Sequence, residues 1–542
     1  MEKHLALDEF LANYKNKDLI KAKVIIDCLE EIDVTERNRI LSELANMDDD
    51  FAIPVLAYLS YKHPTLVAET PQLKGLLLEK SAANPGRIVK CLVDITPETI
   101  VLVGLVEKEK IREALPHLRQ FLTQNIEIDL QLAILKTLGN LKDENAVASL
   151  AEVIPGSIES IQNEAVISLG KIGTSKALEE LSNIFGNSSK LDEKIFDILT
   201  NLDTEQSFDY LPKSLESPNA ETRILGKSKL SRLGSKAIPS LTKALQKNNP
   251  DLQIHVLNVL LEIADESSVK AIRQLLNTEP ENANVRFAAF EALAHLPSLK
   301  GDYLLATGLT DKDDTIRLAA AKAIEKNLDQ KLITGIKNMV QSQDAEAVRI
   351  IKAIVDAEAA ELLLSLLDLP FFNRISTEYI ALKVHQSIRD FFLTYLADKG
   401  KSELADRIKQ MSSTRQDTAT RPFICAVDDS KMILSVYRRV INELGFEPVL
   451  FEKPEVSLFW LSENKPRVVF TDLNMPKITG IELSKKIREQ YSLSDLPIVM
   501  VTTQEEGKDK NELTAAGINR IISKPFDTDT IKAVLAELSI SL

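Results

Sequence analysis

Cysteine and long apolar runs are scarce in this sequence. Three cysteines occur in 542 residues, Cys28, Cys91 and Cys425, too few and too scattered for a disulfide framework or a metal site. Each lies in an apolar run, which is typical of small buried side chains in a reducing compartment. No stretch approaches the roughly 18 apolar residues that cross a membrane, and residues 1–19 lack the uninterrupted apolar core of a signal peptide. We therefore expect a cytoplasmic protein.

Positive charge is also in deficit. The chain has 66 Lys and Arg against 80 Asp and Glu, a net charge of -14, so phosphate-rich surfaces should repel it. This charge argues against broad binding to nucleic acids or to anionic membranes, and the lack of a long apolar run argues against membrane insertion. The six histidines are dispersed without metal-ligand spacing. The lysines between residues 227 and 247 are better explained as a solvated helix face than as a basic binding strip.

One pattern recurs through the first three quarters of the chain. Four apolar residues fall at offsets 0, 4, 8 and 11, which places them on one face of a helix. The clearest copies are Ile161-Ala165-Leu169-Ile172, Leu130-Ile134-Leu138-Leu141, Leu191-Ile195-Leu199-Leu202, Leu252-Val256-Leu260-Ile263 and Val285-Ala289-Leu293-Leu296. Weaker copies begin at Thr222, Ile316 and Glu346, so the starts are 30 to 33 residues apart.

A second apolar stretch separates these helices, as in AIPSLTKAL and SVKAIRQLL. Each unit is therefore predicted to be a helix pair, and stacked pairs would bury a continuous core as a solenoid. The segments VRFAAFEALAHLPS, IRLAAAKAIEKN and IQNEAVISLGKIGT resemble the second helix of HEAT-like (PBS-lyase-type) repeats. The resemblance covers about residues 100–358, and it implies an all-α scaffold that binds proteins along its concave face.

The ends of this array depart from the repeat. Residues 1–100 are predicted to be helical, as degenerate repeats or a capping region, and residues 359–411 break the period. We expect longer helices there, including TEYIALKVHQSIRDFFLTYLADKG, as a C-terminal cap of a solenoid spanning 1–411. The segment Gly226-Lys227-Ser228 is not a phosphate-binding loop, because Glu221 stands where that motif requires glycine.

The polar segment 412–422, SSTRQDTATRP, is predicted to be a linker. From 423 to 542 the pattern changes to alternating strands, ICAVD, EPVLFE, RVVFTD, PIVMVT and NRIISK, and helices that begin near Lys431, Pro454, Thr479, Glu506 and Asp527. This alternation predicts an α/β doubly wound domain with a five-stranded parallel sheet. Active sites in such sheets lie at the carboxyl ends of the strands.

Five polar residues follow those strand ends. Asp428 and Asp429 come after the first strand and Asp472 ends the third. Three crowded carboxylates favour a cation, and hard oxygen ligands point to Mg²⁺. One carboxylate can then act as a nucleophile that forms an aspartyl phosphate. Thr502 can donate a hydrogen bond to the phosphoryl group, and Lys524 supplies positive charge to it.

The segments VDDS, TDLNMPKITG, MVTT and SKPF resemble the signature segments of the receiver domain of bacterial two-component response regulators. The resemblance covers about residues 422–542 and implies that Asp472 is the phosphoacceptor. It also implies a role for each neighbour: Asp428, Asp429, Asp472 and the backbone carbonyl of Asn474 as Mg²⁺ ligands, Thr502 as the switch hydroxyl, Lys524 as the phosphate-contacting lysine before a cis peptide with Pro525, and Gly480 as the residue that permits a tight turn.

Two positions depart from the receiver pattern. Ile521 stands where the family often has an aromatic switch residue, and Thr503 stands where a very small residue is usual. Ile521 argues against coupling between an aromatic ring and Thr502, and Thr503 should alter access to the site. Trp460 is expected to pack in the core.

The leading hypothesis is a signalling protein that is not otherwise an enzyme. A histidine kinase or phosphotransfer protein would phosphorylate Asp472, and the output would be protein contact, because no further output domain follows the last predicted helix. The alternative is a binding scaffold whose receiver is a phosphate sink or a passive docking module. An enzymatic array of the bilin-lyase kind rests on the repeat type alone, and no residue supports it.

Overall fold

The structure is a computed structural model that describes residues 5–296, 303–413, 421–475, 477–502 and 514–540. The chain divides into two compact units, Met1–Lys213 and Ser214–Leu542. Within the described ranges, none of the helices combines the length and apolar character needed to cross a membrane.

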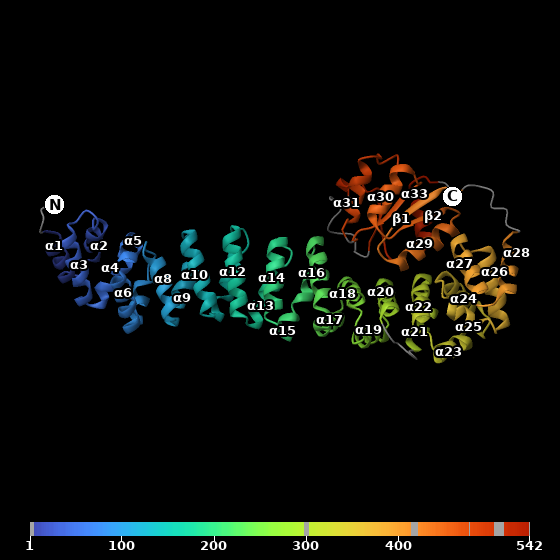
Figure 1. The fold of residues 1–542 in the computed structure, drawn as a ribbon, viewed down its shortest axis with the longest axis horizontal. Helices are drawn as coiled ribbons and strands as arrows, with labels where there is room; N and C mark the ends of the chain where they lie inside the picture. Colours follow the sequence, from blue (N-terminus) through green and yellow to red (C-terminus); the bar gives the residue numbers. More distant parts are fainter. Residues whose placement is uncertain (1–4, 297–302, 414–420, 476, 503–513, 541–542) are drawn as a thin grey trace. The chain divides into compact units, whose positions relative to one another are not determined.

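The first unit is built from helices, of which α8, α10, α12 and α14 lie side by side in sequence order (Figure 1). Its α-helices are α1 (Leu5–Lys15), α2 (Leu19–Asp27), α3 (Val34–Asn46), α4 (Asp49–Lys62), α5 (Pro64–Glu69), α6 (Pro71–Ala83), α7 (Pro85–Cys91), α8 (Thr99–Glu109), α9 (Leu115–Phe121), α10 (Ile128–Asn140), α11 (Val147–Val153), α12 (Glu159–Ile172), α13 (Ser175–Asn183), α14 (Ser189–Asn201) and α15 (Glu205–Phe208). The helical character predicted for residues 1–100 is therefore confirmed.

The second unit continues the helical array and ends in an α/β domain. Its array helices are α16 (Ala220–Leu233), α17 (Ile238–Leu245), α18 (Pro250–Ile263), α19 (Ser268–Asn277), α20 (Ala283–His295), α21 (Tyr303–Thr307), α22 (Asp314–Lys326), α23 (Gln330–Val340), α24 (Ala345–Asp356), α25 (Ala360–Leu366), α26 (Pro370–Leu382), α27 (Gln386–Asp398) and α28 (Ser402–Ser413). The even-numbered helices from α16 to α26 contact one another in order, as stacked repeats require.

The eight helices predicted from the repeat are all present, each beginning one or two residues before its first predicted apolar position. Recurring N-cap residues explain why they start there, because each cap side chain accepts a backbone N–H of the first helical turn. These caps are Ser188, Asn219, Asn249, Asn282, Asp313 and Asp344. Most predicted apolar positions are buried, but Leu202 lies just past α14 and is 37% exposed.

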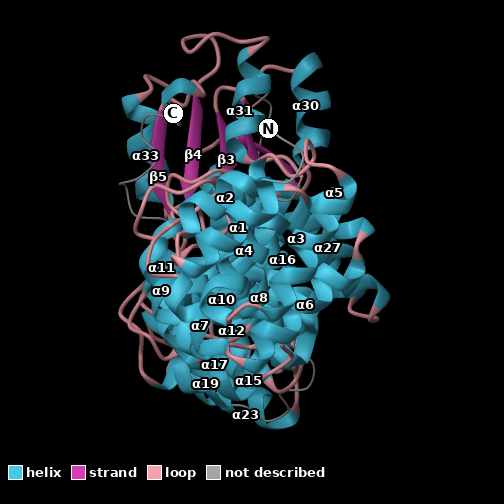
Figure 2. Cartoon of the chain, turned by 90° about the vertical axis from the view of Figure 1, so that its left-hand side faces the viewer, coloured by secondary structure: helices cyan, strands magenta, loops and turns pink. Residues whose placement is uncertain are grey.

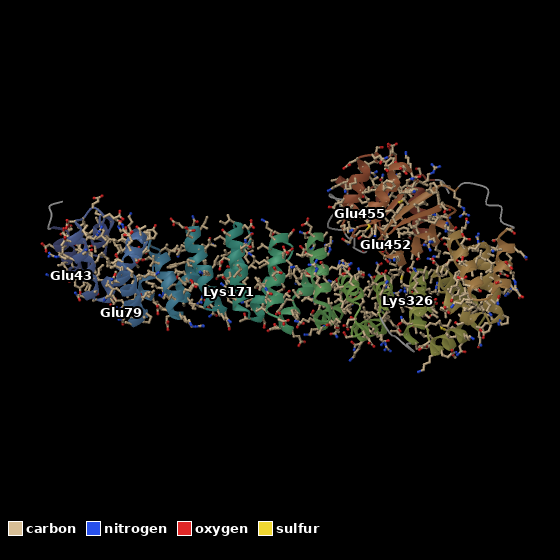
Figure 3. All side chains as sticks on the ribbon, viewed as in Figure 1. Glu43, Glu79, Lys171, Lys326, Glu452 and Glu455 are labelled. Carbon is tan, nitrogen blue, oxygen red and sulfur yellow. The ribbon has the colours of Figure 1, made fainter. Side chains whose placement is uncertain are left out.

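The repeat period ends after α24, as predicted, but the prediction of longer helices there is wrong. The segment expected to form one long helix is interrupted between Leu382 and Gln386. His385 caps the second helix by accepting the backbone N–H of Ser387 through its ring nitrogen. Charged residues such as Glu79, Lys171 and Lys326 are exposed on the outside of the helices (Figure 3), so the apolar side chains form the core.

Residues 423–540 contain the predicted five-stranded parallel sheet, whose strands are ordered β2-β1-β3-β4-β5. They are β1 (Phe423–Val427), β2 (Glu447–Phe451), β3 (Val469–Asp472), β4 (Ile498–Thr502) and β5 (Arg520–Ser523), with α29 (Lys431–Glu443), α30 (Pro454–Glu463), α31 (Gly480–Arg488) and α33 (Thr528–Glu537). The helix predicted near Glu506 lies outside the described residues. Of the predicted linker, Ser412 and Ser413 belong to α28, and residues 414–420 are not described.

Helices cover both faces of this sheet (Figure 2). On one face α30 and α31 contact each other over a core that includes Cys425, Val469 and the ring of Trp460, which packs as predicted. On the other face α29 and α33 meet, and the ring of Tyr437 contacts Phe470 and Phe526. Because every strand is parallel, all the strand ends that carry the predicted site residues lie at one edge.

Candidate phosphoacceptor site

The register of the sheet places the first and third strands' carboxylates side by side. Val427 is the partner of Thr471, so Asp428 and Asp472 are next to each other at the carboxyl edge. Asp472 in turn pairs with Val501, and Thr502 pairs with Ser523, the residue before Lys524. Strand pairing therefore brings Asp428, Asp472, Thr502 and Lys524 to one edge of the sheet.

The ammonium group of Lys524 lies between two of these carboxylates. Its Nζ is 2.6 Å from Asp428 Oδ2 and 2.7 Å from Asp472 Oδ1. The backbone N–H of Lys524 donates to the carbonyl of Thr502 at 2.8 Å, which fixes where the lysine leaves the sheet. Asp428 is fully buried, and Asp472, Thr502 and Lys524 are each less than 10% exposed. The peptide between Lys524 and Pro525 is cis, as predicted.

Burial and mutual repulsion shape the protonation of this cluster. Burial, opposed in part by Lys524, raises the pKa of Asp428 to about 7. Burial and the charge of Asp472 raise the pKa of Asp429. Burial lowers the pKa of Lys524, but the two adjoining carboxylates outweigh it and raise that pKa above its usual value. The lysine therefore stays charged. Each further positive charge placed beside the ionised carboxylates would stabilise them.

The loop after β3 orients Asp472. The backbone N–H of Asn474 donates to Asp472 Oδ2 at 2.8 Å, leaving Oδ1 for Lys524. Gly480, at the start of α31, lacks the positive φ that would make it a turn glycine. A Cβ at Gly480 would lie 2.1 Å from the carbonyl oxygen of Asp472, so glycine is needed here for close approach of two backbone segments.

The donor set suits a divalent cation of the Mg²⁺ type. Asp428, Asp429 and Asp472 are oxygen donors, and the charge of Asp472 helps to raise the pKa of Asp428 and of Asp429. Mg²⁺ commonly uses one or two carboxylates together with waters and phosphate oxygens. No cluster of three or more Asp, Glu, His or Cys with metal-binding geometry occurs among the described residues. Asp429 and Asn474 line the same cavity as Asp428 and Asp472, consistent with the predicted ligand set.

The departures from the receiver pattern can be placed only in part. Ile521 lies in β5 opposite Met500 and packs against the small core of Leu473 and Met500, which gives it a structural role. Thr503 lies outside the described residues.

Sequence reasoning missed the residues of the repeat array that meet this site. The site opens into a cavity of about 800 Å³ whose other wall comes from α16, α18 and α20. Ser430 donates its hydroxyl hydrogen to Glu291 of α20, and the charge of Lys227 of α16 acts on Asp429. No local pattern marks Glu291 or Lys227 as site residues, because each lies in an ordinary repeat helix.

A parallel sheet of this order, with a buried Asp–Lys site at its carboxyl edge, defines a receiver-type signalling domain. Residues 424–536 match the family model for the response regulator receiver domain, and residues 238–325 match that for HEAT repeats. The chain belongs to the response regulator receiver family, and its receiver follows an array of helical repeats.

Several curated relatives resemble this domain. A chemotaxis protein CheY homolog of Campylobacter jejuni is 36% identical over 119 residues, which cover 21% of this chain and 90% of the relative. Chemotaxis protein CheY1 of Helicobacter pylori is 35% identical over 116 residues, 21% of this chain and 92% of the relative. Among solved structures, chemotaxis response regulator CheY4 of Vibrio cholerae is 29% identical and covers 22% of this chain and 99% of its own, with a TM-score of 0.21.

Proposed function

We propose that the protein is a response regulator of a phosphorelay, and that Asp472 accepts a phosphoryl group from a histidine kinase or phosphotransfer protein. The observation that carries this proposal is the ammonium group of Lys524 held between Asp428 and Asp472. It places a fixed positive charge beside the carboxylate where phosphoryl oxygens would gather during transfer.

In the proposed step, a carboxylate oxygen of Asp472 attacks the phosphorus of the donor. The bond from phosphorus to the donor's leaving group breaks, and the leaving group keeps the electron pair. Lys524 neutralises charge on the transferred group, and Thr502 donates a hydrogen bond to it. Bound Mg²⁺, held by Asp428, Asp429, Asp472 and the carbonyl of Asn474, would supply further charge neutralisation.

We further propose that the HEAT-like array is the output, because helical arrays present extended surfaces for protein partners. Phosphorylation at Asp472 would then change protein–protein contacts of the array. In a purely passive docking module the buried charge cluster would serve no purpose. A phosphate sink would be revealed by competition with a second receiver for the same phosphodonor.

The test is labelling with acetyl phosphate and Mg²⁺, followed by intact mass, on the wild type, Asp472→Ala and Thr479→Ala. Thr479 caps α31 outside the site and serves as a control. We expect a gain of about 80 Da, one phosphoryl group on a single acceptor, in the wild type and the control but not in Asp472→Ala. Equal labelling of Asp472→Ala would refute Asp472 as the acceptor.

A further inference from the structure

Helix α29 of the receiver is buried on more than one side. Its residues Met432, Tyr437 and Val440 face the domain core, as expected for a helix on a sheet. Yet Ser435 is also buried, at 6% exposure, and Arg439 retains only 10% of its side-chain exposure. The covering residues belong to the repeat array of the same compact unit.

Polar contacts join α29 to successive array helices. Lys322 of α22 donates to Ser435 Oγ at 2.6 Å, and Arg439 Nη1 is 3.6 Å from Asp314 Oδ2. Arg438 pairs with Glu358, which follows α24. The neighbouring contacts extend the same surface at both ends of α29: Ser430 to Glu291, Asn442 Nδ2 to the carbonyl of Lys383 at 3.0 Å, and Glu447 Oε1 to His385 Nε2 at 3.1 Å.

Two arginines of the receiver face carboxylates of the array. The receiver side contributes Arg438 and Arg439, and the array side contributes Glu358, Asp314 and the buried Asp356. Such charge pairs fix the position of one surface on the other more than they add to the strength of binding. We call the array side, formed by Glu291, Asp314, Lys322, Asp356, Glu358 and His385, the docking strip.

The interface is imperfectly satisfied, which suits a contact that must open. The Nε of Arg439 is buried without a hydrogen-bond partner among the described residues. Lys322 is largely buried with a neutral hydroxyl as its hydrogen-bond partner, and burial lowers its pKa to about 8. Both groups would recover full hydration if the receiver moved away from the array, so separation is less costly than for an apolar interface.

Contact between the receiver and the array also covers the phosphoacceptor site. The cavity at Asp472 is about 800 Å³, a size that suits a small ligand. A protein phosphodonor would have to bring at least one helix, about 10–12 Å across with its side chains, together with the domain that holds it. The space such a donor needs is occupied by α16, α18 and α20.

We propose that the docking strip is an intramolecular gate that admits small phosphodonors to Asp472 and excludes protein donors until α29 leaves the array. The contact between Ser430 and Glu291 ties the gate to the site itself, because Ser430 is two residues from Asp428 and its N–H binds that carboxylate at 2.9 Å. The inference rests on the proposed function only for the role of the gate in phosphorylation. Whether a large molecule can reach the cavity at Asp472 does not depend on that function.

Access can be measured with a thiol at the cavity wall. The probe is Asn474→Cys in the full chain with Cys28→Ser and Cys91→Ser; Cys425 stays, since it is fully buried and burial raises its pKa. The ratio of reaction rates with N-ethylmaleimide and with the same maleimide on a polymer the size of a small protein reports the gate. Intrinsic thiol reactivity cancels in this ratio. Lys477→Cys, whose native side chain is 79% exposed and is not part of the cavity lining, gives the ratio for an open site.

Charge reversals at the pair of Arg438 and Glu358 are expected to separate the receiver from the docking strip, or to restore the contact when combined. Arg438→Glu and Glu358→Arg each place like charges together, and the pair combined restores the contact. Lys485→Glu, an exposed reversal on α31, is the matched control. We expect the parent and Lys485→Glu to favour the small reagent about tenfold or more over the open reference, each single reversal to abolish that preference, and the double variant to regain it.

A parent ratio equal to that of the open reference would overturn the gate, and so would single reversals that leave the parent ratio unchanged. Circular dichroism checks that each variant is folded. Glu291→Gln, which weakens the contact with Ser430 without reversing a charge, is a milder second variant on the array side. Acetyl phosphate labelling of the wild type, Arg438→Glu and Glu358→Arg, all with Asn474 retained because it belongs to the proposed Mg²⁺ site, separates the two proposals. Loss of labelling at Asp472 would refute the proposed function and leave the access ratios untouched.

Discussion

Lys524 links the proposed chemistry of the site to the stability of the receiver. It is the counter-ion of Asp428, which is fully buried, and of Asp472, which is nearly so. Removing one partner of a buried pair leaves the other charge unsolvated, which commonly costs several kcal/mol. The same carboxylate oxygens would also favour a divalent cation. The lysine and a metal ion would therefore neutralise the same negative charges, those of Asp428 and Asp472.

We predict that Lys524→Ala lowers the free energy of unfolding of the receiver by about 3 kcal/mol in EDTA, because Asp428 loses its counter-ion. Added Mg²⁺ should stabilise this variant more than the wild type, since its carboxylates lack the competing ammonium. Urea denaturation followed by circular dichroism measures both effects. Lys477→Ala, whose side chain is 79% exposed, should change stability by no more than about 0.5 kcal/mol. Equal stability of the two variants in EDTA would contradict the assignment.

At this scale the sequence revealed the site because parallel strand ends converge. Asp428, Asp472 and Lys524 are predictable from strand patterns alone, since register follows from the fold. Gly480 was predicted for the wrong reason: close approach to the Asp472 carbonyl, and not a turn conformation, excludes a side chain. Glu291 was not predictable, because its contact with Ser430 spans 139 residues and depends on docking.

Among the elements, five of the eight repeat helices have a second stabilising contact at their N-termini besides the N-caps. Four residues after the start cap, a long side chain reaches back to carbonyls of the preceding loop. Arg286 Nη1 donates to the carbonyls of Pro280 and Glu281 at 2.7 and 2.8 Å. Gln253, Gln162, Arg223 and Arg317 make equivalent contacts at their positions. These bonds satisfy loop carbonyls that helix packing would otherwise leave buried.

We predict that Arg286→Ala lowers the free energy of unfolding by about 2–4 kcal/mol, since it removes charged hydrogen bonds and leaves Asp311 of a largely buried pair alone. Arg286→Gln should cost clearly less, because Gln253 shows that an amide at this position reaches the loop carbonyls. Thermal unfolding of the two variants checks the order. Equal losses would show that the ion pair with Asp311, and not the loop contact, is the stabilising feature.

The element boundaries that the sequence predicted best are those with local signals. The 30–33-residue period placed helix starts within two residues, and polar caps precede six of the eight apolar stripes. The break between α26 and α27 was missed because Lys383, Val384 and His385 include neither glycine nor proline. His385 there acts as an N-cap through its ring, a role that a sequence pattern does not distinguish from a surface histidine.

Across the second compact unit, the proposed gate depends on a contact that no periodicity encodes. Repeat spacing and receiver motifs are local patterns, whereas α29 and its flanking residues Ser430 and Glu447 meet residues from α20 to the loop before α27. The contact is also electrostatically demanding, as Asp356 shows. Asp356 is buried at the end of α24, and its oxygens accept hydrogen bonds from the hydroxyl of Tyr379 at 3.1 and 3.0 Å.

Burial raises the pKa of Asp356 from 3.8 to about 7, although Arg439, Tyr379 and Lys352 oppose the shift and Glu443 adds to it. The folded state therefore binds more protons than the unfolded state between about pH 4 and pH 7. Stability falls with rising pH wherever the folded state binds more protons, so this carboxyl lowers the free energy of unfolding across that window. Above pH 7 the carboxylate is charged in both states and its cost is constant.

We predict that Asp356→Asn, which keeps the shape and can still accept from Tyr379, removes this cost. The variant should gain about 1–3 kcal/mol of unfolding free energy relative to wild type at pH 8 and approach it near pH 4, because the wild-type carboxyl is neutral there. The difference between the two proteins, measured by urea denaturation from pH 4 to pH 8, isolates Asp356 from Asp428, which titrates in the same range. A difference that does not change with pH would mean that Arg439 keeps Asp356 ionised throughout, and that the docking strip is held by a true buried ion pair.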